Sequence, residues 1–213
     1  MTRSDTIAGA LAWFDSGAFL RDLDRRVAFH TESQEPEQAS ALAAYLDDEM
    51  APTLARLGFT SRIVPNPDPA YGPFLIATRH ESDELPTVFT YGHGDVIRGY
   101  DKQWRTGLGP WRIVVDGERW YGRGTADNKG QHSINLAALE QVLQARGGRL
   151  GFNVKLLIEM GEETGSPGLR ELAQSLRTEL AADVLLASDG PRLTAAQPTV
   201  FLARAASSPS ICT

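Results

Sequence analysis

The amino-acid sequence predicts an α/β layered domain. Segments rich in β-branched and aromatic residues alternate with segments whose apolar residues recur every three or four positions. Hydrophobic residues make up 42% and charged residues 23% of the chain, which is the balance of a globular protein. The 213 residues suffice for one large domain or two small ones, with a sizeable core.

The N-terminal part is predicted to be helical. Residues 16–33 and 36–59 carry apolar residues at helical spacing, and Pro36 and Gly58 mark a start and a stop of the second segment. The earlier apolar run IAGALAWF, residues 7–14, is short and lacks a basic segment before it. We therefore interpret it as the core of a helix rather than a signal peptide.

Strands and helices alternate along the rest of the chain. Their composition and turn residues predict two short strands around a proline-rich turn, a buried strand, a hairpin turning at Asp116-Gly117, a helix, a strand, a helix and two more strands. These elements fall in residues 60–80, 86–93, 111–124, 129–146, 152–160, 166–180, 182–190 and 198–203, in that order.

Composition excludes several classes of function. A net charge of −6 argues against nucleic acid as the main partner. The single cysteine, Cys212, allows no disulfide within the chain and no cysteine-based zinc site, which suits a cytoplasmic protein. No segment approaches the roughly 18 apolar residues of a membrane span, so we expect no membrane partner.

Four short stretches at predicted strand ends carry side chains suited to chemistry. In the first, GHGDV, His93 and Asp95 are two residues apart and would share one face of a strand. A metal-bound imidazole usually donates its other N–H to a carboxylate. A structural His–Asp pair is the alternative for this motif alone.

The second stretch, GRGTADNKG, lacks the spacing of a phosphate-binding loop. Asp127 stands where a dinucleotide-binding motif would have its last glycine, and its charge would repel phosphate. One interpretation is a glycine-rich turn capped by Asp127 or Asn128 before the helix. The other is a frame that aims the Asp127 carboxylate at a metal.

The third and fourth stretches, EMGEETGS and SDGP, add carboxylates. Glu162 and Glu163 are adjacent, so one could bind a metal while the other holds a water; a solvated acidic loop is the alternative. Asp189 ends an apolar strand at a turn, where aspartate is common for backbone reasons alone. Together with His93 and Asp127 they form a ligand set for zinc or a similar divalent ion.

With its four motifs in register, the sequence resembles the dinuclear zinc peptidases of metallopeptidase family 20, which include carnosinase, carboxypeptidase G, succinyl-diaminopimelate desuccinylase and acetylornithine deacetylase. The resemblance runs from about Phe14 to Leu202 and is strongest to the dipeptidase branch. It implies a zinc-peptidase-like catalytic domain, with a mixed central sheet flanked by helices. It also implies hydrolysis of an amide bond in a dipeptide or N-acyl amino acid, the small-molecule substrate being the partner.

The resemblance also implies roles for individual residues. His93 and Asp189 would hold one zinc ion, Asp127 would bridge two, and Glu163 would hold the second; cobalt and manganese are alternative metals. Asp95 would orient His93. Glu162 would be the general base that takes a proton from a water shared by the metals and later passes it to the leaving amine.

Members of the family are about twice as long, so we expect an incomplete fold that lacks the lid and dimerisation domain and the C-terminal part. We therefore expect residues 1–204 to be the N-terminal part of the catalytic domain. Residues 205–213 look like an aberrant tail, and one choice of codons in another frame gives an alternating apolar–polar string, which suggests a frameshift.

Three functional hypotheses follow. The first is a metal-dependent dipeptidase or amidohydrolase. The second is a catalytically inactive fragment of such a peptidase that at most binds metal, because a second-metal histidine is missing: His30, His80 and His132 match no ligand motif. The third, a nucleotide-binding module, would need a glycine in place of Asp127.

Overall fold

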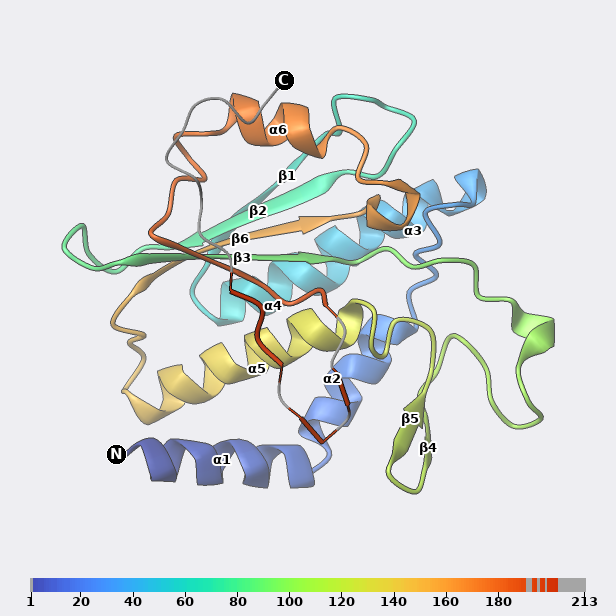
Figure 1. Ribbon diagram of the computed structural model, residues 1–213, viewed down its shortest axis with the longest axis horizontal. Coiled ribbons are helices and arrows are strands. Elements are labelled where there is room, and N and C mark those ends of the chain that lie inside the picture. Colours follow the sequence, from blue (N-terminus) through green and yellow to red (C-terminus); the bar gives the residue numbers. More distant parts are fainter. Residues whose placement is uncertain (1, 191–192, 195, 198, 203–213) are drawn as a thin grey trace.

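The computed structural model describes residues 2–190, 193–194, 196–197 and 199–202. Its centre is a five-stranded mixed sheet in the order β1-β2-β6-β3-β7 (Figure 1). Strands β1 (Thr60–Val64), β2 (Phe74–Arg79) and β6 (Asn153–Glu159) pair antiparallel, whereas β3 (Thr87–His93) pairs parallel with both β6 and β7 (Val184–Ala187). The prediction of a mixed sheet flanked by helices is confirmed.

Helices cover both faces of this sheet (Figure 1). On one face, α3 (Ala39–Ala44), α4 (Ala51–Arg56) and α5 (Lys129–Ala145) pack on β2 and β6 around a core that includes Leu54, Leu136 and Ile158. On the other face, α6 (Leu169–Ser175) packs Leu172 against Phe74 and Leu157. The apolar faces that the sequence periodicity predicts are therefore buried by opposite layers.

The N-terminal helices lie outside the main core. Helix α2 (Ala18–Val27) buries Phe19, Leu23 and Val27, but α1 (Arg3–Asp15) buries no residue completely. The prediction that the run 7–14 lies within a helix is confirmed, although this helix buries no residue completely. Its apolar side chains instead contact an aromatic cluster at the protein's edge, where Phe14 stacks on Trp120.

The segment predicted as one helix over residues 36–59 is a composite. A 3₁₀ turn at Pro36–Gln38, α3, a π-helical stretch at Tyr45–Met50 and α4 follow one another without a break. The π-helical stretch buries Tyr45 and Glu49 together with two apolar residues. Such stretches frequently occur near functional sites.

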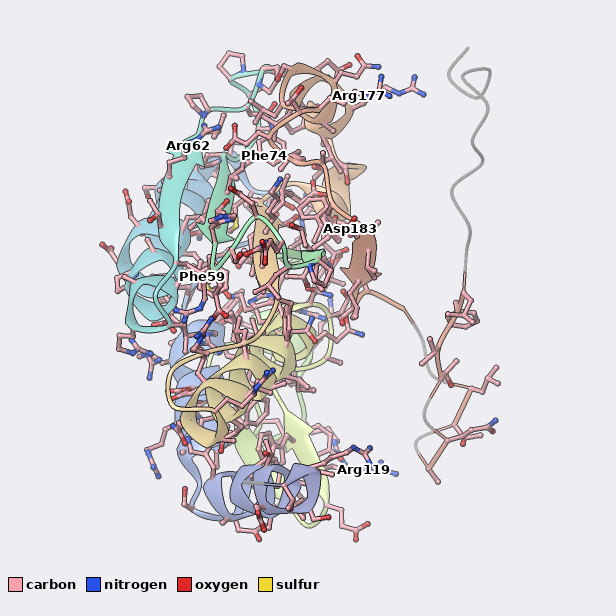
Figure 2. All side chains as sticks on the ribbon, turned by 90° about the vertical axis from the view of Figure 1, so that its left-hand side faces the viewer. Phe59, Arg62, Phe74, Arg119, Arg177 and Asp183 are labelled. Atoms are coloured by element: carbon pink, nitrogen blue, oxygen red, sulfur yellow. The ribbon has the colours of Figure 1, made fainter. Side chains whose placement is uncertain are left out.

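A hairpin of β4 (Val114–Asp116) and β5 (Arg119–Tyr121) projects from the body, with Arg119 at its far end (Figure 2). Asp116 pairs with Arg119, so the two turn residues are Gly117 and Glu118, one position later than predicted. The sequence predicts a strand at residues 198–203, but residues 199–202 form none. Strand β7 is the last strand of the sheet on this side. The predicted aberrant tail at 205–213 lies outside the described residues.

Strands β1 and β7 form the two edges of the sheet, as Arg62 on β1 and Asp183 beside β7 show (Figure 2). Strand β7 is apolar yet exposed along its whole length. In the described part of the chain, no helix is both long enough and apolar enough to cross a membrane.

Candidate metal centre

Three parallel strands end at the same edge of the sheet and bring the predicted motifs together. His93 is the last residue of β3, Glu159 opposite it is the last residue of β6, and Asp189 follows β7 by two residues. The loop after β6 carries Glu162 and Glu163 in a 3₁₀ turn. This is the sheet edge at which open α/β proteins place their sites.

The buried imidazole of His93 is the centre of the group. Its Nε2 atom lies 3.0 Å from Asp127 Oδ1, 3.8 Å from Glu162 Oε2 and 3.9 Å from Asp189 Oδ2. Its Nδ1 atom faces the other way, 3.0 Å from the carbonyl oxygen of Asp95 and 3.3 Å from Asp95 Oδ1. One ring nitrogen therefore faces the carboxylates and the other is held from behind, as in histidines that bind metals.

Asp95 holds more than the histidine. This carboxylate is completely buried, and its two oxygens accept the backbone N–H groups of Glu162 (3.2 Å) and Glu163 (3.1 Å). The same side chain thus fixes the ring of His93 and the start of the glutamate turn. The predicted orienting role of Asp95 has geometry that suits it.

The glycine-rich loop places Asp127 at the edge of the group. Gly124 has a left-handed backbone with φ +79°, and a Cβ on Gly130 would lie 1.9 Å from the carbonyl oxygen of Thr125. These glycines allow the sharp turn before α5. The Asp127 side chain is 69% exposed while its oxygen contacts His93, so it faces the open side of the site.

The two adjacent glutamates are placed differently. Candidate ligand atoms of His93, Glu162 and Asp189 lie within 4.8 Å of one another, and Glu163 is not part of that group. The family resemblance implies the reverse roles, with Glu163 as the ligand and Glu162 as the base. Both roles stay predictions, which substitutions at the two positions separate.

Electrostatics show an excess of negative charge around one imidazole. Burial lowers the pKa of His93, but its hydrogen bond to Asp95 and the charges of Asp95, Asp189 and Glu162 outweigh this and raise the pKa to about 9. Burial, together with the charge of Asp127, raises the pKa of Glu163 to about 6, and burial and neighbouring carboxylates raise that of Glu162. A divalent cation would relieve this repulsion.

The donor set therefore fits a divalent metal. One imidazole nitrogen and several carboxylate oxygens are ligands that zinc accepts, and the orientation of His93 adds the expected support from behind. The remaining three histidines are placed elsewhere: His30 stacks on Trp111, His80 contacts Asp83, and His132 bonds to Tyr45. None of them belongs to the group of candidate ligands found among the described residues.

Sequence reasoning missed the residues behind the ligands. The sequence predicts Asn128 at most as a cap for α5, but its side chain makes no capping bond and instead contacts His93, Ser188 and Asp189. Glu159 is completely buried, and its carboxylate accepts hydrogen bonds from Tyr91 and Ser166. Their only sequence signal is their position beside the four motifs.

Comparison with known proteins identifies the family of the chain. The sequence model of Peptidase family M20/M25/M40 matches residues 89–201, which is more than half of the chain and includes all four motifs. The chain belongs to this family. Within the family, the chain is similar to members of the dipeptidase branch.

Two of the similar curated proteins are dipeptidases. The Beta-Ala-His dipeptidase of Mus musculus is 31% identical over 200 residues, covering 85% of this chain and 39% of that protein. The Cysteinylglycine-S-conjugate dipeptidase of Corynebacterium striatum is 32% identical over 127 residues, covering 59% of this chain and 27% of that protein. The M20-family chain thus spans less than half the length of these curated relatives.

Solved structures show the same fold. Human carnosine dipeptidase 1 superposes with a TM-score of 0.78 at 27% identity, over 88% of this chain and 41% of that chain. The M20 family metallo-carboxypeptidase Sso-CP2 from Sulfolobus solfataricus gives a TM-score of 0.67 at 26% identity, over 80% and 37% of the two chains. The catalytic-domain architecture expected from the sequence is thereby confirmed.

Proposed function

We propose that this chain carries the metal-binding and proton-transfer groups of a peptidase that hydrolyses the amide bond of a dipeptide or an N-acyl amino acid. The observation that carries the proposal is the orientation of His93, whose Nε2 atom faces carboxylates from three separate segments. Membership of the M20/M25/M40 family and the two dipeptidase relatives support the reaction and the class of substrate.

The residues that would hold metal are His93, Asp127, Glu163 and Asp189. We propose zinc, with cobalt or manganese as alternatives, and two ions that share Asp127. When bound, such ions polarise the scissile carbonyl and lower the pKa of water. The exposed side of Asp127 suits contact with a second ion.

Glu162 is the proposed proton carrier. Its side chain is 37% exposed, so water and substrate reach it, and its Oε2 atom lies 3.8 Å from the Nε2 atom of His93. Burial raises its pKa, and the charges of Asp189, Asp95 and Asp127 add to this while His93 opposes it, so the carboxylate takes up a proton more readily than a solvated glutamate does. Its carboxylate would accept a proton from the attacking water and then donate that proton to the leaving amine.

The test is turnover of dipeptides with Gly or β-Ala residues by the zinc- or cobalt-loaded chain, with Glu162→Gln and Glu163→Gln as a matched pair. We expect Glu162→Gln to abolish turnover while it retains the metal, and Glu163→Gln to lower metal content. Turnover that survives Glu162→Gln would show that the base is another group. Equal metal content in both variants would remove the ligand role of Glu163.

A second candidate is a chain that binds metal without catalysis. It is favoured by the ligand count, because only one of the four histidines reaches the group and a second ion would have Asp127 and Glu163 as its protein ligands. Stoichiometric metal binding without turnover of any dipeptide would select it. Homodimerisation, a cytoplasmic location and the absence of nucleic-acid partners stay predictions.

A further inference from the structure

We propose that Asn128 is the positioning residue that holds the ends of β3 and β7 together, and so sets the separation of the ligands His93 and Asp189. The inference rests on the proposed metal-binding function and adds a residue that contacts both ligand-bearing strand ends. Asn128 is completely buried at the start of α5. It does not need to touch substrate or metal to act.

The carboxamide of Asn128 bonds to both strand ends. Its Nδ2 atom donates to the carbonyl oxygen of Ser188 at 2.7 Å and lies 3.3 Å from Asp189 Oδ1, both just after β7. Its Oδ1 atom accepts the backbone N–H of His93 at 3.2 Å, at the end of β3. The β3–β7 pairing in the register ends at Tyr91 and Ala187, so the asparagine joins the strands where their own hydrogen bonds have stopped.

A second histidine fixes which way the carboxamide faces. His132, one helical turn further along α5, places Nδ1 at 3.3 Å from Asn128 Oδ1, and its Nε2 lies 2.7 Å from the Tyr45 hydroxyl. Burial lowers the pKa of His132 well below its ordinary value, so the ring is neutral with one hydrogen. A hydrogen on Nδ1 then donates to Asn128, and Tyr45 donates to Nε2.

Strand β3 leaves space for this contact. A Cβ at Gly92 would lie 2.9 Å from Asn128 Oδ1 and 3.1 Å from the Cβ of His132. Any side chain there would displace the asparagine from the strand. The close approach of α5 to β3 therefore explains why the first residue of the GHGDV motif, Gly92, is a glycine.

A carboxamide offers both an acceptor and donors to these partners. Its oxygen faces two donors, and its nitrogen faces the Ser188 carbonyl, the Asp189 carboxylate and Gln131 Oε1, which are all acceptors. An aspartate would lose the donor and place a second negative charge beside Asp189. The side chain is not explained as a helix cap, because it makes no capping hydrogen bond to the backbone of α5.

The test compares Asn128→Asp with Asn135→Asp in the full chain. Both substitutions add one negative charge at or near the start of α5, but Asn135 exchanges hydrogen bonds with the side chain of Ser188 and, among the described residues, has no bond to His93 or Asp189. Zinc affinity is measured by competition with a chromophoric chelator, and the ligand geometry by the visible absorption of the Co²⁺-loaded protein. Circular dichroism establishes that each variant is folded.

We expect Asn128→Asp to weaken zinc binding about 10–100-fold and to change the Co²⁺ spectrum, while Asn135→Asp changes neither. If Asn128→Asp does not fold, Gly92→Ala is measured in its place, with the same expected loss. Unchanged affinity and spectrum in the folded variant would overturn the inference and leave the proposed function standing. A wild-type chain that binds neither zinc nor cobalt would overturn both.

Discussion

Replacing Asp95 with asparagine tests how the site is supported. The two oxygens of the buried carboxylate each accept one backbone N–H from the glutamate turn, and one of them also faces His93 Nδ1. A carboxamide must turn its NH₂ group toward one of these N–H donors. One charge-assisted hydrogen bond is lost, which costs about 1.5–3 kcal/mol in the free energy of unfolding.

The same substitution removes the anion behind His93. Loss of a partner that orients a ligating histidine typically weakens metal binding about 10–100-fold, or roughly 1.4–2.8 kcal/mol. Urea unfolding of the metal-free protein measures the first effect, and zinc competition measures the second. Asp83→Asn is the control, because its side chain is 99% exposed. Asp95→Asn behaving like this control in both assays would refute the proposed support.

Three further predictions concern charge and exposure. The pKa of His93 without metal is about 9, so its proton stabilises the fold below about pH 6.5, and this contribution is lost as pH rises through 9. Zinc must displace that proton, so zinc affinity should rise about tenfold per pH unit from pH 7 to 8. Zinc affinity measured by calorimetry that does not change between pH 7 and 8 would contradict this. Leu185 is 64% exposed on the edge strand β7, so Leu185→Lys should reduce the light scattering that self-association causes. Equal scattering from the variant and the wild-type protein would show that self-association does not occur through β7. Glu49→Ala leaves Arg26 buried and should lower the free energy of unfolding by about 3–5 kcal/mol, against less than about 1 kcal/mol for the exposed Glu179→Ala; equal losses in urea unfolding would contradict this.

Local sequence signals were sufficient for most of the sheet. Strands β1, β2, β3 and β6 stand where β-branched and aromatic runs predict them, because such side chains suit a pleated surface that is at least partly buried. The apolar run of β7 also predicts a strand, but not its exposure. The exposure of a strand depends on which other elements pack against it, and the sequence of β7 alone does not predict those elements.

The π-helical stretch at Tyr45–Met50 could not be predicted from spacing, since apolar residues three and four apart also suit an ordinary helix. This stretch places Tyr45 in contact with a residue far away in the sequence. Tyr45 bonds to His132, 87 residues later, and through it reaches Asn128. Contacts of this kind depend on how α5 crosses the sheet.

The ligand-bearing positions were easier to predict than the residues that support them. His93 ends one apolar strand and Asp189 follows another by two residues, and strand ends in parallel sheets meet at one edge. Asn128 lies beside a predicted ligand, but nothing in its neighbours shows that its side chain points toward two strands. The structure adds this supporting layer to the site.

The most direct test of the account is the metal content of the purified chain after dialysis against zinc and then against metal-free buffer. The account predicts that the wild-type chain retains zinc and that His93→Gln loses it, while His30→Gln, at a histidine stacked on Trp111, retains it. Zinc retained equally by all three proteins, or by none, would contradict a metal centre at His93.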